Sequence, residues 1–377
     1  MAHKAFLIIA ALSINSASGA DLNSSTLQKM EDLQSQYNLP SLSVAIGLGD
    51  EVVFAEAIGY ADIGAAEEAS AQTQYSVGSL AKPMTGIALA KLVDLGKVKL
   101  EDRVNTYVAS PEYTKDFTVE ELAAHIAGVP HDTPERDLAE FKNVKDHRSP
   151  LEAFYVFDKH PLLFEPGTEF QYSSNGYILL SALIEGVSEA GYVDFLERSL
   201  WSAFEMKETE LDTSFAGKNT EATYYSKADS DGKHVVSTSH RDRSFLFGGG
   251  GFISTPSDLV KMSQATYDES YLSDDAKDLL ATPITLRNGE VNSDKYSLGW
   301  RVGKVKVSRE SEQTWTALHH GGVTDYASNA YVLVIPECKA SIAFATNFVP
   351  EKFWRMRGAM AKILLGYIDE KDCSHFD

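Results

Sequence analysis

A serine and a lysine stand three residues apart in the sequence YSVGSLAKP, residues 75–83. Residues with this spacing lie on one face of a helix, so the amine of Lys82 can reach the hydroxyl of Ser79. A serine hydroxyl is a poor nucleophile near neutral pH until a base takes its proton, and a lysine shielded from water can be that base. The pair therefore predicts a nucleophilic serine, Ser79, with Lys82 as its general base.

The segment after this pair is expected to be a buried helix. Apolar residues recur every three or four positions from Pro83 to Leu95, and Gly96 ends the pattern. Ser79 is thus predicted at the N-terminus of a helix, where free backbone N–H groups and the positive end of the helix dipole stabilise an oxyanion.

A tyrosine in a second segment, PGTEFQYSSNGY at residues 166–177, is the next candidate. Tyr172 follows a turn and precedes a predicted helix, so its phenol can accept or donate a proton opposite Ser79. Without Ser79 and Lys82, the better explanation for Tyr172 would be a half-buried tyrosine whose hydroxyl makes a structural hydrogen bond.

Two histidines and two glycines form a third segment, LHHGG at residues 318–322, at the end of a predicted strand. Adjacent strand residues point to opposite faces, so His319 and His320 cannot both face one cleft, and metal binding is the weaker explanation for them. A glycine-rich strand edge lets a substrate backbone approach closely. The backbone N–H of Gly322 is predicted to complete an oxyanion hole with that of Ser79.

The order of helices and strands shows how these segments meet. Strand-like runs lie near both ends of the chain, among them residues 298–307, and helical patterns such as residues 119–127 fill the middle. This order favours one antiparallel sheet with a helical insertion beside it. We expect residues 21–377 to form one domain, with an α/β part at about 21–96 and 290–370 and a helical part at about 97–289. The polar stretch at residues 212–243 is expected to be a loop at the edge of a cleft.

The three segments together resemble a known family. Ser79-x-x-Lys82, Tyr172-x-Ser174 and His319-x-Gly321 resemble, in this order, the three motifs of serine β-lactamase-related proteins and penicillin-binding proteins. The resemblance runs from about Leu27 to Tyr367 and is greatest to class C β-lactamases, D-aminopeptidase-like enzymes and especially LACTB-like serine proteases. Three flanking segments add to it: VEELAAHIAGVP at residues 119–130, GGGFIST at residues 249–255 and SLGW at residues 297–300.

This resemblance implies a fold and a set of roles. The fold is α/β, with an antiparallel sheet flanked by helices plus an all-α insertion domain. Ser79 becomes acylated, Lys82 and Tyr172 share the acid and base work, and the reaction needs no metal or organic cofactor. The residues that bind substrate or the oxyanion are Ser174, His319, Gly321 and Gly322.

Two positions depart from the family pattern and bear on the substrate. Most β-lactamases and D,D-peptidases of this group have asparagine where this chain has Ser174 and lysine where it has His319, and Asn175 comes one position late. Histidine is mostly neutral near pH 7 and holds a carboxylate less firmly than lysine. We therefore expect a peptidase or D-amino-acid-type peptidase ahead of an esterase or a weak β-lactamase.

Two other functions are compatible with these residues. A penicillin-binding or sensor protein would be acylated at Ser79 with little turnover. A filament-forming protein is the other alternative, because LACTB-like proteins are associated with filaments. Separately, His125 is expected to be a structural, hydrogen-bonding residue and not a catalyst.

Composition limits the partners. The 377 residues include 34 Lys and Arg against 54 Asp and Glu, for a formal net charge of −20. Such acidity disfavours nucleic acid and anionic membrane surfaces, so a small molecule or peptide is the expected partner. The oligomeric state stays open.

Residues 1–20 have the pattern of a cleaved secretory signal. His3 and Lys4 precede an apolar run, and small residues at 18–20 form a cleavage site. The run is too short to span a bilayer, so a membrane anchor is the lesser alternative and we expect a secreted or periplasmic protein without a membrane span. Cys338 and Cys373 can pair in an oxidising compartment, and two free thiols are the other possibility.

Overall fold

The computed structural model describes residues 19–108, 116–131, 149–155, 159–213, 220–226, 233–237, 242–306, 312–324, 328–368 and 373. The predicted signal lies outside these ranges except for its last two residues, which begin helix α1 (Gly19–Tyr37). No helix within the described ranges is long and apolar enough to cross a bilayer.

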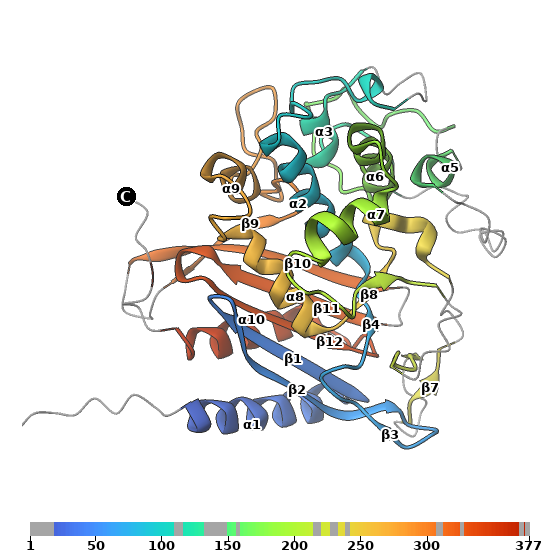
Figure 1. Ribbon diagram of the computed structural model, residues 1–377. Helices are drawn as coiled ribbons and strands as arrows, with labels where there is room; N and C mark the ends of the chain where they lie inside the picture. Colours follow the sequence, from blue (N-terminus) through green and yellow to red (C-terminus); the bar gives the residue numbers. More distant parts are fainter. Residues whose placement is uncertain are drawn as a thin grey trace, which may run out of the picture.

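A large antiparallel sheet forms the centre of the molecule (Figure 1). In the described part of the chain it has seven strands in the order β3-β2-β1-β12-β11-β10-β9. Strands β1 and β12 pair near its middle, so the sheet joins the two ends of the chain as the sequence predicts. The bounds are β1 Ser41–Leu48, β2 Glu51–Asp62, β3 Glu67–Glu68, β9 Arg301–Lys306, β10 Thr314–Thr324, β11 Ser328–Ile335 and β12 Ala340–Thr346.

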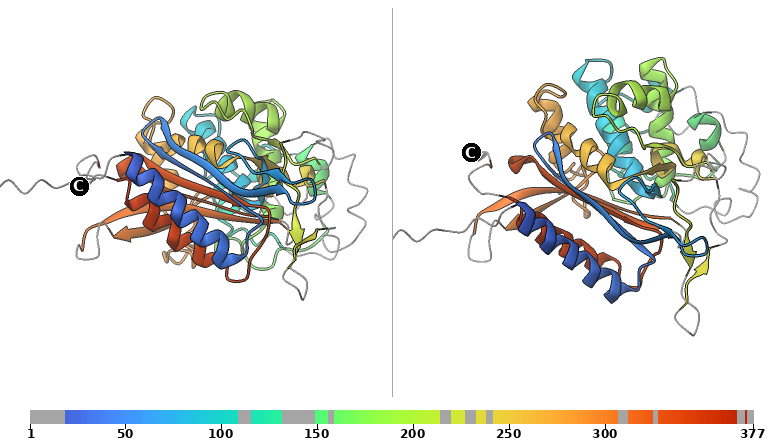
Figure 2. Two further views of the ribbon diagram at one scale, coloured as in Figure 1. Left: turned by 90° about the horizontal axis from the view of Figure 1, so that it is seen from below. Right: turned by 60° about the horizontal axis from the view of Figure 1, so that its bottom comes forward.

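Helices cover both faces of this sheet. Helices α1 and α10 (Trp354–Leu365) lie side by side on one face, and the remaining helices lie on the other (Figure 2). Met356, Met360 and Leu364 recur at helical spacing along α10 and are buried in the core against the sheet. The predicted α/β fold, an antiparallel sheet flanked by helices, is confirmed.

Helix α2 (Ala81–Asp94) runs through the centre of the other helical layer (Figure 1). It is apolar on nearly every side, and most of its side chains are buried, as expected for a helix surrounded by protein. The helices around it are α3 Val119–Ala123, α5 Pro150–Phe154, α6 Ser174–Ser188, α7 Tyr192–Leu196, α8 Pro256–Ser263 and α9 Asp274–Ala281.

Two predicted elements are shorter than their sequence pattern indicates. Helix α3 covers only the first part of the helix predicted for residues 119–127, because His125 adopts a φ of 63° and turns the chain out of the helix. The strand predicted for residues 298–307 begins only at Arg301, because residues 297–300 form a turn. Both departures lie next to the residues that could do chemistry.

A smaller sheet holds the segment that leads to Ser79. Its strands, counted over the described residues, lie in the order β4-β8-β5, with bounds β4 Tyr75–Ser76, β8 Phe252–Ser254 and β5 Glu210–Leu211. A separate hairpin pairs β6 (Tyr225–Ser226) with β7 (Val235–Val236). Because β4 ends just before Ser79, the smaller sheet sets the starting point of the serine's turn.

Cys338 and Cys373 form a disulfide that closes a loop with a sequence separation of 35 residues. The loop contains β12 and α10, so the bond ties the last helix to the sheet that it covers. A cross-link that closes a loop of this size restricts the unfolded chain and stabilises a protein by about 3–4 kcal/mol.

We expect the double variant Cys338→Ala/Cys373→Ala to lose about 3–4 kcal/mol of unfolding free energy, measured by urea denaturation. Dithiothreitol should destabilise the wild type to the same extent and leave the variant unchanged. Equal stability of the wild type with and without reductant would contradict a stabilising disulfide.

Candidate active site

Ser79 lies in a tight turn between β4 and α2. The turn is a 3-10 helix, η1 (Gly78–Leu80), and Gly78 adopts a φ of 50°, a left-handed conformation that glycine reaches without strain. Gly78 and Leu80 are buried, whereas Ser79 is partly exposed. The turn therefore presents Ser79 to an incoming molecule at the start of a buried helix.

Lys82 is fully buried one turn after Ser79. Its Nζ lies 3.2 Å from Ser79 Oγ, 2.9 Å from Ser174 Oγ and 2.6 Å from the carbonyl oxygen of Gly249. A neutral amine has two N–H donors and one lone pair. A neutral Lys82 can donate to Ser174 and Gly249 and can accept the proton of Ser79.

The second segment places Ser174 and Asn175 in different surroundings. Ser174 begins α6 and contacts Lys82, whereas the amide nitrogen of Asn175 donates to the carbonyl oxygens of Pro130 (3.0 Å) and His131 (3.2 Å). Asn175 thus points away from Lys82, as its late position in the sequence predicts. Ser174 occupies the place beside the lysine.

Tyr172 lies beside Lys82 in an aromatic and cationic setting. Lys82 Nζ lies 4.7 Å from the centroid of the Tyr172 ring, and the guanidinium carbon of Arg301 lies 5.3 Å from it. The ring of His125 lies 4.6 Å away. Tyr172 is partly exposed, so its ring lies beside the buried amine and also reaches the surface.

His320, and not His319, lies on the face of β10 that meets Tyr172. The rings of His320 and Tyr172 are 6.2 Å apart, whereas His319 packs on the opposite face, 5.9 Å from the ring of Tyr331. The expected position of His319 is therefore corrected: His320 takes the place beside Tyr172. Strand alternation indicates only that one of the two faces the cleft, and the register of β10 in the sheet decides which.

Gly322 shares the face of His320 and lies directly against the turn of Ser79. A side chain at Gly322 would overlap the carbonyl oxygen of Val77 and lie 3.2 Å from the backbone nitrogen of Ser79. Only glycine lets β10 come this close to the nucleophile.

The edge of β10 is open at this point. Strand β9 pairs with β10 only as far as His319, so residues 320–324 have no partner from β9. Gly321 faces the other side of the sheet, where an added side chain would overlap the guanidinium of Arg357. The predicted site glycines therefore lie at a free strand edge beside Ser79, one facing each side of the sheet.

Hydrogen bonds hold His320 in its neutral form. The Nη1 of Arg301, which can only donate, and the hydroxyl of Tyr296 both lie 3.0 Å from His320 Nε2, so this nitrogen is the acceptor. The proton then resides on Nδ1, which lies 2.9 Å from the carbonyl oxygen of Gly321. Burial, together with the charges of Arg301 and Lys82, lowers the pKa of His320 well below its usual value.

Arg301 is a site residue that the sequence analysis missed. Its guanidinium lies over the rings of Tyr172 and Tyr296 (5.5 Å for the second), and its Nε donates to Asp294 at 2.7 Å. The segment SLGW, quoted above for its family resemblance, ends one residue before Arg301. The site therefore has the guanidinium of Arg301, ion-paired with Asp294, beside a neutral histidine, in place of a lysine on β10.

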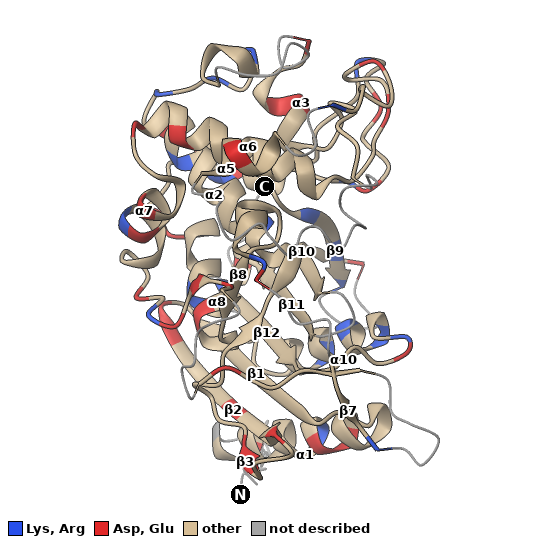
Figure 3. Ribbon diagram, turned by 90° about the vertical axis from the view of Figure 1, so that its right-hand side faces the viewer, with Lys and Arg blue, Asp and Glu red and all other residues tan. Residues whose placement is uncertain are grey.

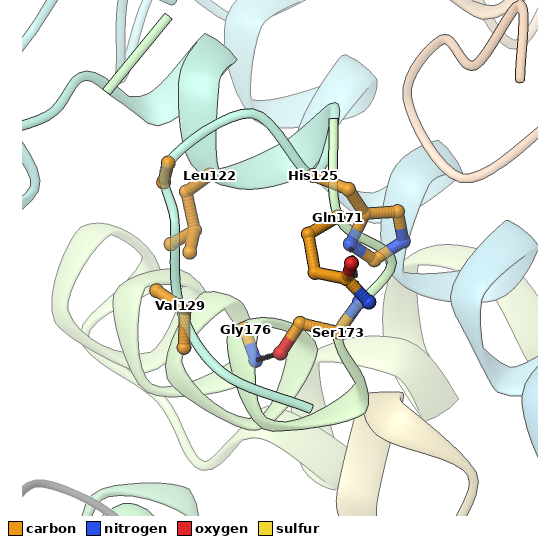
Figure 4. Close-up of a pocket in the computed structure, with 7 residues that line it drawn as sticks. Leu122, His125, Val129, Gln171, Ser173 and Gly176 are labelled. Carbon is orange, nitrogen blue, oxygen red and sulfur yellow. Dashed lines mark hydrogen bonds between the residues drawn. The ribbon is translucent and has the colours of Figure 1, made fainter. Parts of the chain in front are cut away.

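His125 supports the second segment from behind. Its Nδ1 accepts the backbone N–H of Ser173 at 3.1 Å, and burial lowers its pKa well below the usual value. Figure 4 shows His125, Gln171 and Ser173 around a small pocket between α3 and the start of α6, and neither Ser79 nor Lys82 lines it. Its surroundings agree with the expected structural role of His125.

The arrangement can carry out nucleophilic attack with proton transfer. Ser79 is accessible, Lys82 is placed to take its proton, and a glycine-rich strand edge lies where an oxyanion would form. Over the described residues, no group of three or more His, Cys, Asp or Glu side chains could hold a metal ion.

This fold and this site define the class of β-lactamase-type serine hydrolases. The chain belongs to the beta-lactamase family, whose model matches residues 27–364. That match covers the large sheet, the helical layer and every residue of the site. The predicted family resemblance is confirmed.

Curated relatives span most of the chain. The human mitochondrial serine beta-lactamase-like protein LACTB is 24% identical over 393 residues, covering 81% of this chain and 70% of that protein. Penicillin-binding protein 4* of Bacillus subtilis is 24% identical over 295 residues, covering 74% of this chain and 62% of that protein.

Solved structures show the same fold. The octameric penicillin-binding protein homologue from Pyrococcus abyssi has a TM-score of 0.70 at 22% identity, covering 93% of this chain and 76% of that one. A D-stereospecific amidohydrolase from Streptomyces sp. has a TM-score of 0.68 at 20% identity, and the match covers 86% of this chain and 94% of that one. At these identities the likeness concerns the fold.

Proposed function

We propose that this protein is an acyl-enzyme amidase of the peptidase type, with Ser79 as nucleophile and Lys82 as general base. The observation that carries the proposal is the pair itself: an accessible serine whose oxygen lies 3.2 Å from the amine of a fully buried lysine. Tyr172 and Ser174 complete the proton-transfer group beside Lys82, and the backbone N–H groups of Ser79 and Gly322 bind the oxyanion.

The substrate in this proposal carries an anionic group near the scissile bond. Arg301 supplies a fixed positive charge beside Tyr172, and Arg357 lies against Gly321 on the other face of the open strand edge. Lys and Arg lie on β9 and α10 (Figure 3), although the chain has a formal net charge of −20. A peptide or amino-acid amide with a free carboxylate fits this charge, because arginine binds carboxylates with two parallel hydrogen bonds.

Amides take precedence over lactams in the proposal for two reasons. The third segment presents a neutral histidine, His320, and not a lysine on the face that meets Tyr172, and Ser174 stands in the place of asparagine. A D-stereospecific amidohydrolase shares the fold, which supports this class of substrate by analogy.

We further propose that the protein is exported. The signal-like pattern of residues 1–20 and the disulfide between Cys338 and Cys373 both favour an oxidising compartment.

Intact-protein mass spectrometry tests the nucleophile. Wild type and Ser79→Ala would be incubated with a fluorophosphonate, a penicillin and a p-nitrophenyl ester while hydrolysis is followed. We expect one adduct on the wild type, none on Ser79→Ala, and turnover of the ester at a rate at least about 1,000-fold above that of the variant.

Other outcomes would redirect the proposal. A stable penicillin adduct without turnover would favour a penicillin-binding sensor. Equal labelling of wild type and Ser79→Ala would remove Ser79 as the nucleophile.

A further inference from the structure

Ser76 lies three residues before Ser79, and buried side chains bind all three of its polar groups. Its hydroxyl donates to Asp212, its backbone N–H donates to the hydroxyl of Tyr224 at 2.6 Å, and its carbonyl oxygen accepts from Ser328. Ser76 is 1% exposed, so protein groups and not bulk water satisfy it. The last residue of β4 is therefore fixed on three sides.

Asp212 reaches Ser76 across the smaller sheet. It directly follows β5, and the central strand β8 separates β5 from β4, where Ser76 lies. The backbone of Asp212 is already bonded: its N–H donates to the carbonyl of Gly251 and its carbonyl accepts from the N–H of Arg243, both at 2.9 Å. The backbone hydrogen bonds of Asp212 thus already attach its segment to the neighbouring chain. The hydrogen bond described for its carboxylate is the one that it accepts from Ser76.

Burying this carboxylate is unfavourable in itself. Asp212 is fully buried, and burial raises its pKa to about 6, although the hydrogen bond from Ser76 and the charge of Arg243 oppose the shift. The polar stretch at residues 212–243 was expected to be a loop at a cleft edge, yet Asp212 and Arg243 at its two ends are both buried. Burying a charged group costs free energy unless hydrogen bonds or an opposite charge compensate for it.

A second carboxylate ends a parallel chain of hydrogen bonds. The hydroxyl of Tyr224, which accepts from Ser76, donates to Glu221 at 3.2 Å. Burial raises the pKa of Glu221 to about 7, and the charges of Asp212 and Glu210 add to the shift. At about pH 8 both carboxyl groups are mostly ionised and can accept hydrogen bonds.

The same cluster connects the serine's turn to β10. The hydroxyl of Ser328 bonds both to the carbonyl of Ser76 and, at 2.8 Å, to the hydroxyl of Thr324. Thr324 in turn packs against Gly78, where an added side chain would meet its methyl group at 2.9 Å. Ser76 is therefore the point at which the nucleophile's turn and the oxyanion strand are tied together.

We propose that Asp212 is a positioning residue for acylation, which holds the turn of Ser79 against β10 through its hydrogen bond from Ser76. The inference rests on the proposed role of Ser79 as nucleophile. Asp212 contacts neither substrate nor Ser79, so its effect should be on the rate of acylation and not on substrate affinity.

The test compares Asp212→Asn, Ser76→Ala and the double variant at about pH 8. We expect each single variant to slow fluorophosphonate labelling and kcat by about 10- to 100-fold, the size of one charge-assisted hydrogen bond, with KM within about twofold. The double variant should be no slower than the slower single variant, because both remove the same bond.

Asp242→Asn is the matched control. Asp242 is a neighbouring carboxylate whose described hydrogen bonds go to Ser244 on its own turn. It should label at the wild-type rate. Multiplicative losses in the double variant, or equal slowing by Asp242→Asn, would overturn the positioning role.

Amide hydrogen exchange separates this inference from the proposed function. In Asp212→Asn and Ser76→Ala, a peptide covering residues 76–82 should exchange at least about 10-fold faster, while peptides of the large sheet keep their wild-type protection. This readout does not need catalysis, so it still decides the role of Asp212 if the wild type fails to label. Wild-type exchange rates at residues 76–82 in both variants would contradict the inference.

Discussion

Replacing Lys82 with methionine is expected to slow acylation of Ser79 by about 100- to 10,000-fold, the range contributed by a general base. Methionine keeps an unbranched side chain of similar length but has no amine to take the proton. The measurement is the second-order rate constant for fluorophosphonate labelling at Ser79, followed by mass spectrometry. The loss should appear with esters and amides alike, because proton removal precedes attack on either carbonyl.

The structure also predicts a moderate loss of stability in this variant. Lys82 Nζ lies 2.6 Å from the carbonyl of Gly249 and 2.9 Å from the hydroxyl of Ser174, and both acceptors would lose a buried partner. Unsatisfied buried acceptors cost about 1–3 kcal/mol each, so thermal unfolding must be measured beside activity.

The nearby Lys91→Met serves as a control on α2, because Lys91 bonds to the carbonyl of Tyr271 away from Ser79. A Lys82→Met protein that is folded and labels at the wild-type rate would exclude Lys82 as the base.

Replacing Arg301 with glutamine is expected to raise KM for a carboxylate-bearing substrate by about 10- to 100-fold and to leave a neutral ester unaffected. The expected size follows from a charge-assisted hydrogen bond, worth about 1.5–3 kcal/mol. The assay compares an amino-acid amide that has a free carboxylate one residue from the scissile bond with its methyl ester. Burial and the charge of Lys82 still lower the pKa of His320 when Arg301 is removed, so His320 is not expected to replace the lost charge.

Lys304→Gln is the matched control for Arg301. Lys304 lies on the same strand, and its replacement by glutamine removes the same charge. Its amine, however, donates to the hydroxyl of Thr316 at 3.1 Å and does not point toward Tyr172. Equal KM changes in both variants would indicate a general effect of net charge. An unchanged KM in Arg301→Gln would show that the substrate carries no anion at this place.

Local spacing and family resemblance predicted the parts of the site that depend on short-range geometry. Ser79 lies in the turn η1 and Lys82 in the first turn of α2, so helical geometry over residues 79–82 is enough to bring the two side chains together. The antiparallel sheet was also predictable, because strand patterns at both ends of the chain leave few other arrangements.

The residues that were missed depend on register and on contacts between distant segments. Whether His319 or His320 faces Tyr172 is decided by which face of β10 packs on the helices, which alternation alone leaves open. Arg301 enters the site because a turn shifts the start of β9. Asp212 meets Ser76 through a separation of 136 residues, and no local pattern could indicate that contact.

The pairing of β1 with β12 has a consequence for biosynthesis. Ser43 on β1 lies opposite Ala345 on β12, so the hairpin of β1 and β2 leaves the ribosome long before its partner strand exists. Until then one edge of that hairpin has unpaired backbone groups, which can pair with strands of other chains. Long-range pairing of this kind also folds slowly. Chains truncated before residue 340 should therefore aggregate and not form a smaller folded unit, and this protein is expected to depend on chaperones for most of its translation.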